Sequence, residues 1–170
     1  MTGGLRELFG AVGEPLPAAV RALAADYVVG LEARAPAVAV VPSWTEAARL
    51  IRADGWDPRF AAAEARHRER LRVVAQRERG EATLSRLLSV SVDSAAEETL
   101  RAATAAAARA GCSDEGMIRA AAGAASEALY LGALAEAAAA KPAHPFSKRR
   151  ALFLAGRWPL GVQRGVLLVF

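Results

Sequence analysis

Two histidines and one cysteine are the side chains of this sequence best suited to catalysis or metal binding, and they lie far apart along the chain. His67 falls in a helical pattern and His144 precedes a proline, and neither belongs to a recognisable metal-binding motif. Cys112 precedes a helix start, but no histidine lies near it in sequence to act as a base. The sequence also lacks a phosphate-binding glycine loop and a nucleophile elbow. We therefore favour a protein that is not an enzyme, and we expect no cofactor and no metal.

Residues 144–158 have the most unusual local composition, because aromatic side chains alternate there with cations. Arginine and aromatic residues dominate the hot spots of protein interfaces. This pattern predicts a partner-binding surface made of His144, Phe146, Lys148, Arg149, Arg150, Arg157 and Trp158. The alternative is that the aromatic residues pack this C-terminal segment against the rest of the fold while its charged side chains point to water.

The net charge of +4 is unevenly distributed. Residues 141–170 contain six basic and no acidic residues, which leaves 16 basic against 18 acidic residues in the remainder. A basic tail favours a partner with an acidic surface, or phosphates. A tail that packs on the acidic remainder of its own chain would show the same pattern.

Three functional hypotheses follow. The first is a small bacterial protein that acts by protein–protein binding, as an adaptor or as a toxin-neutralising, immunity-like protein. The second is nucleic-acid binding by the tail and the arginine-rich helix 58–79, although the glutamates mixed among those arginines are more typical of a solvated surface. The third is an enzyme or a small-ligand pocket inside the bundle, with Tyr27, Glu127 and Tyr130 as the first candidates.

These residues must be positioned by a fold centred on residues 94–140, an alanine-dominated stretch broken at 111–113. Ser94 and Glu97 have the spacing of a capping box, which predicts a helix start. Gly111 then ends this helix and Ser113 caps the next one. We therefore predict two helices whose small side chains allow close packing.

The remaining chain predicts a mainly α fold: one domain over residues 1–170, with six to seven helices and a short C-terminal β-hairpin. Further helices are predicted from Pro15, from Ser43, over 58–79, before Ser94 and after Ser147. The hairpin covers residues 157–170, with its turn at 163–165. An isolated hairpin is marginal in water, so it needs a further strand. The β-branched run at 36–42, a short strand or an extended linker, could supply that strand, and so could a partner protein.

Composition also predicts where the protein works. Twenty arginines against two lysines are typical of a GC-rich bacterial genome. A single cysteine excludes an internal disulfide, and no secretion signal is recognisable, so we expect a reducing bacterial cytoplasm. Glu127 and Glu136 interrupt the longest apolar stretch, which argues against a transmembrane segment. Homo-oligomerisation is left open, and no motif points to a known family.

Overall fold

The computed structural model describes residues 4–33 and 37–170, and these residues are mainly α-helical. After a 3-10 turn, η1 (Gly4–Glu7), come α1 (Ala18–Gly30), β1 (Ala37–Val40), α2 (Trp44–Ile51), α3 (Pro58–Arg79), α4 (Glu81–Arg109), α5 (Glu115–Ala137), α6 (Pro145–Leu154), β2 (Pro159–Gln163) and β3 (Val166–Val169). The predicted fold class is confirmed. Within the described ranges, no helix combines the length and the apolar composition needed to cross a membrane.

The long central stretch differs from its prediction at one helix start. The break near Gly111 is confirmed, but α4 runs without interruption through Ser94, so the predicted helix start there is wrong. A serine caps a helix only where the preceding chain leaves the helix, and residues 81–110 contain neither glycine nor proline to end it. Two predicted helices are therefore one.

The second central helix begins one residue later than expected. Asp114, rather than Ser113, caps α5, because its side chain accepts a hydrogen bond from the Met117 backbone N–H at 3.0 Å. Asp and Ser are comparable N-caps, and only the path of the loop selects between neighbouring candidates.

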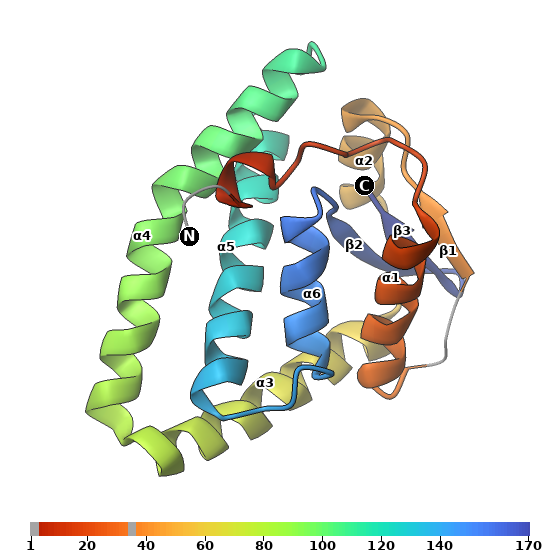
Figure 1. The fold of residues 1–170 in the computed structure, drawn as a ribbon. Coiled ribbons are helices and arrows are strands. Elements are labelled where there is room, and N and C mark those ends of the chain that lie inside the picture. The colour runs from red at the N-terminus through yellow and green to blue at the C-terminus, as the bar shows by residue number, and fades with distance from the viewer. Residues whose placement is uncertain (1–3, 34–36) are drawn as a thin grey trace.

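The helices pack around α5 and α6 (Figure 1). α5 lies between α4 and α6, α1 packs on α6, and α3 passes across the lower ends of α5 and α6 in this view. The buried side chains form two clusters, and α5 contributes to both. One face of α5 is buried, with Ala124 half-buried at its edge; its buried residues include Met117, Ala121, Ala128, Leu131 and Ala135. The centre of the fold is therefore α5 with α6, and α4 is an outer helix.

The predicted hairpin is completed within the chain. β2 and β3 are antiparallel, and Arg164 and Gly165 form the turn with φ values of 51° and 74°, as a tight hairpin turn requires. β1 pairs in parallel with β3, placing Val38 opposite Leu167, so the run at 36–42 forms the third strand. Pro36, at the start of that run, lies outside the described residues.

Candidate functional site

The seven residues predicted to bind a partner do not form one exposed surface. Four are buried, with exposed fractions of 7% or less: Phe146, Arg149, Arg157 and Trp158. Three are half-buried: His144, Lys148 and Arg150. Partner binding stays a prediction, and it now concerns mainly these three side chains.

The basic tail is paired with carboxylates of its own chain. The ion pairs are Lys148 with Asp26 (3.4 Å), Arg149 with Glu64 and Glu127 (2.8 Å each), Arg150 with Glu136 (2.5 Å) and Arg157 with Glu14 (3.9 Å). The aromatic residues of the tail also face inward, since Phe153 and Trp158 pack edge-on against Phe9. The alternative expectation, a tail that packs on the acidic remainder of the chain, therefore describes the structure.

A polar network around Arg149 joins four helices. Arg149, on α6, donates from Nη1 to Glu64 of α3 and from Nη2 to Glu127 of α5, both at 2.8 Å. The Tyr27 hydroxyl, on α1, donates to the same Glu64 oxygen, Oε1. Arg68 of α3 donates to the other oxygen of Glu127. Two cations thus meet two carboxylates, and the network carries no net charge.

The sequence predicts Tyr27, Glu127 and Tyr130 as pocket residues. Tyr27 and Glu127 lie in this network and Tyr130 does not, and none of the three lines the adjacent cavity. Glu64 is not among the predicted candidates, because the glutamates of helix 58–79 are interpreted there as part of a solvated surface; in the structure it pairs with Arg149. The available signal was that Glu64 follows the buried Phe60 by one helical turn, which places it on an inner face.

Burial and charge together fix the protonation of the network. Burial raises the pKa of Tyr27 well above its ordinary value, and the negative charge of Glu64 raises it further, so the hydroxyl stays protonated and donates. Burial lowers the pKa of Arg149, but the negative charges of Glu64 and Glu127 outweigh this effect and raise it overall. Arg149 therefore remains a cation.

A cavity of about 360 Å³ lies beside this network, and Glu64 and Arg149 form its polar wall. Asp57 is the third charged residue of the lining. The rest of the lining is apolar: Ile51, Trp56, Phe60, Ala61, Ala120, Ala124, Trp158, Pro159, Leu160, Gly161 and Val162. Gly161 has a φ of +139°, and a Cβ there would lie 3.1 Å from Trp56 Cε3. The Trp56 ring therefore packs directly on the backbone of β2.

Two donors of the network lack an acceptor. The Nε–H groups of Arg149 and Arg68 are buried and have no hydrogen-bond partner among the described residues. An unpaired buried donor costs free energy, so these two groups reduce the stability that the network adds.

No family model, curated protein or solved structure matches this chain. The function must therefore be argued from the geometry of the site.

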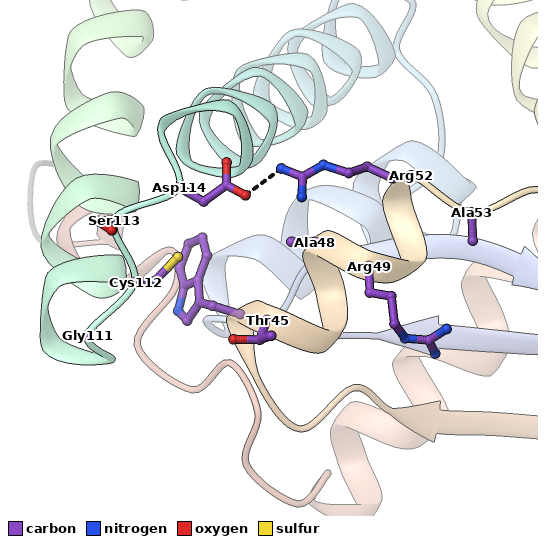
Figure 2. Close-up of a pocket in the computed structure, with 10 residues that line it drawn as sticks. Thr45, Ala48, Arg49, Arg52, Ala53, Gly111, Cys112, Ser113 and Asp114 are labelled. Atoms are coloured by element: carbon purple, nitrogen blue, oxygen red, sulfur yellow. Dashed lines mark hydrogen bonds and ion pairs between the residues drawn. The ribbon is translucent and has the colours of Figure 1, made fainter.

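A second concavity lies between α2 and the connection from α4 to α5, and its volume is about 650 Å³ (Figure 2). Cys112 and Thr45 face it, but its charged groups already have partners. Arg52 is paired with Asp114, and Arg49, which points away from Asp114 in this view, is paired with Glu46. No group of charges converges here as it does at Arg149.

The remaining candidates from the sequence have different surroundings. His67 and His144 lie together, with ring centroids 5.7 Å apart. Within residues 4–33 and 37–170, no three His, Cys, Asp or Glu side chains are arranged to hold a metal ion.

The nucleic-acid hypothesis relied on the arginines of α3, and four of these are paired with carboxylates: Arg59, Arg68, Arg70 and Arg72. That hypothesis stays an untested prediction.

Proposed function

We propose that this protein binds a small planar molecule in the cavity between α3, α5, α6 and β2, with Arg149 and Glu64 as its polar anchor. The supporting observation is that the Arg149 side chain, at the wall of a mostly apolar cavity, is only 8% exposed and is held by two carboxylates. Small-molecule sites typically combine apolar walls with a few convergent polar groups. Holding that guanidinium in a fixed position prepares it to orient a ligand.

The polar wall favours an uncharged head group. Since the network is neutral, an added full charge would lack a counter-charge and would lose its hydration. Glu64 uses Oε1 to accept from Tyr27 and Arg149, which leaves Oε2 for a ligand donor. The Arg149 Nε–H is buried, so the free acceptor for a ligand is Glu64 Oε2. An uncharged N–H donor, as in a lactam or an amide, fits this acceptor.

The apolar walls favour an aromatic body. Three rings line the cavity, Trp56, Phe60 and Trp158, and aromatic faces stack favourably on planar ligands. A volume of about 360 Å³ is near the lower end for ligand sites, which matches one or two fused rings. The proposed ligand class is therefore a small heteroaromatic molecule with a lactam-like edge.

A fragment titration tests this proposal. We expect 2-quinolinone, which has two fused rings and a lactam edge, to bind with a Kd in the millimolar range, since a fragment contributes about −0.3 kcal/mol per non-hydrogen atom. N-methyl-2-quinolinone lacks the donor and should bind more weakly. Saturation-transfer NMR would detect binding, and quenching of Trp56 and Trp158 fluorescence would monitor the titration.

A matched pair of variants locates the binding. Ala61 and Ala62 are adjacent and exposed on α3, but only Ala61 lines the cavity. Ala61→Phe should abolish binding of 2-quinolinone by filling the rim, whereas Ala62→Phe should leave it unchanged. If both variants bind 2-quinolinone as well as the wild type does, the cavity is not the site. The same conclusion follows if neither probe binds the wild-type protein when the probe concentration is 10-fold the expected Kd.

A further inference from the structure

The helix that carries Arg149 begins at an unusual cap. His144 is the N-cap of α6, and its Nδ1 accepts a hydrogen bond from the Phe146 backbone N–H at 3.2 Å. The common N-caps, Ser, Thr, Asn and Asp, keep their acceptor oxygen at neutral pH and in mild acid. A histidine nitrogen accepts only while it is unprotonated. The cap of α6 therefore exists only in the neutral form of His144.

A second histidine lies beside this cap. The His67 ring, from α3, is 5.7 Å from the His144 ring, and both rings lie against Phe146. His67 Nε2 is buried and has no hydrogen-bond partner among the described residues. Arg66 and Arg70 of α3 and Glu32, after α1, act on His67. On α6, Lys148 lies one turn after His144 and pairs with Asp26 of α1.

These charges do not offer the pair a free counter-ion. Asp26 contacts Lys148 at 3.4 Å, and Glu32 contacts Arg70 at 3.8 Å. A proton on His144 would also place positive charge at the N-terminus of α6, where the helix dipole is already positive. Protonation of either histidine would repel protonation of the other.

We propose that His144 and His67 form an acid-sensitive latch that holds the first turn of α6 and, through it, the position of Arg149. Acidification removes the cap, places charge at the helix start and loosens this turn. A loosened first turn would displace Arg149 and release a ligand from the cavity, and this consequence rests on the proposed function. The effect on the helix itself rests on the cap geometry alone.

The pH window follows from the direction of the shifts. Burial lowers the pKa of His144 below 6.5, and His67 lowers it further. Burial and then Arg70 lower the pKa of His67, with Glu32 opposing them. Between the lowered pKa values of the folded protein and about pH 6.5, the unfolded chain has ordinary histidines and binds more protons than the folded protein. The stabilisation is therefore complete above about pH 6.5 and is lost as the pH falls toward the lowered values.

Thermal unfolding between pH 5.0 and 7.5 tests the latch in a range above the titration of ordinary carboxylates. We expect the Tm of the wild type to fall by about 2–6 °C across this range, the effect of losing one N-cap in a chain of this length. His144→Asn keeps a capping acceptor that does not titrate, so its Tm should fall less. Equal falls in Tm for both proteins would overturn the proposal.

NMR titration of the imidazole signals gives an independent readout in the wild type, whether or not the variant folds. The chain has only two histidines, so two signals are expected, both with midpoints below 6.5. A His144 midpoint at or above 6.5 would overturn the latch. His67→Gln removes the like charge and should raise the His144 midpoint. Neither measurement uses 2-quinolinone, so failure of the latch and failure of the cavity proposal are separable.

Discussion

Replacement of Arg149 by methionine is expected to lower the free energy of unfolding by about 3–5 kcal/mol, the usual cost of removing one partner from a buried ion pair. The main cost comes from Glu64, whose buried carboxylate would lose its cation. Glu64 is 16% exposed and would keep only the Tyr27 hydroxyl as a partner, whereas Glu127 is 39% exposed and would keep Arg68. Urea denaturation monitored by circular dichroism would measure the change.

Two controls separate this effect from a general sensitivity of α6. Arg150, the next residue, pairs with the exposed Glu136, so Arg150→Met should cost no more than about 1 kcal/mol. Adding Glu64→Gln to Arg149→Met removes the stranded charge, and the double variant should be more stable than the sum of the single effects predicts, by about 0.5–3 kcal/mol. Equal losses at Arg149 and Arg150, or strict additivity, would contradict a buried network.

Phe170→Ala is expected to destabilise the protein by about 3–5 kcal/mol. Here the Phe170 side chain is fully buried, its ring lies 5.2 Å from that of Trp44, and its backbone exchanges two hydrogen bonds with Trp158. The substitution therefore leaves a cavity where the sheet meets α2, and urea denaturation would report it.

Leu154→Ala is the matched control for Phe170→Ala. Leu154 is a large apolar residue of the C-terminal region, but it is 42% exposed at the end of α6. Its truncation should change the free energy of unfolding by no more than about 0.5 kcal/mol. A comparable loss in the two variants would show that Phe170 does not anchor the sheet.

Features set by nearby residues could be predicted from the sequence. Pro58, Gly80 and Gly111 mark helix ends by their own backbone restrictions, and the structure has helix boundaries at all three. The hairpin at β2 and β3 follows from β-branched residues on either side of a turn that accepts positive φ. The predicted helix start at Ser94 is wrong because a capping sequence is also local, and it caps a helix only where the preceding residues leave the helix.

The candidate site was decided by the tertiary structure. Arg149 and Arg150 are adjacent and chemically identical, and only the rotation of α6 against α1 and α5 buries one and leaves the other half-exposed. Glu64 lies 85 residues before Arg149, and no local pattern encodes that pairing. The sequence by itself determined most of the helix ends and the hairpin, because backbone preferences act over a few residues. Tertiary packing alone decided which charges meet inside, because burial depends on surfaces that distant segments bring together.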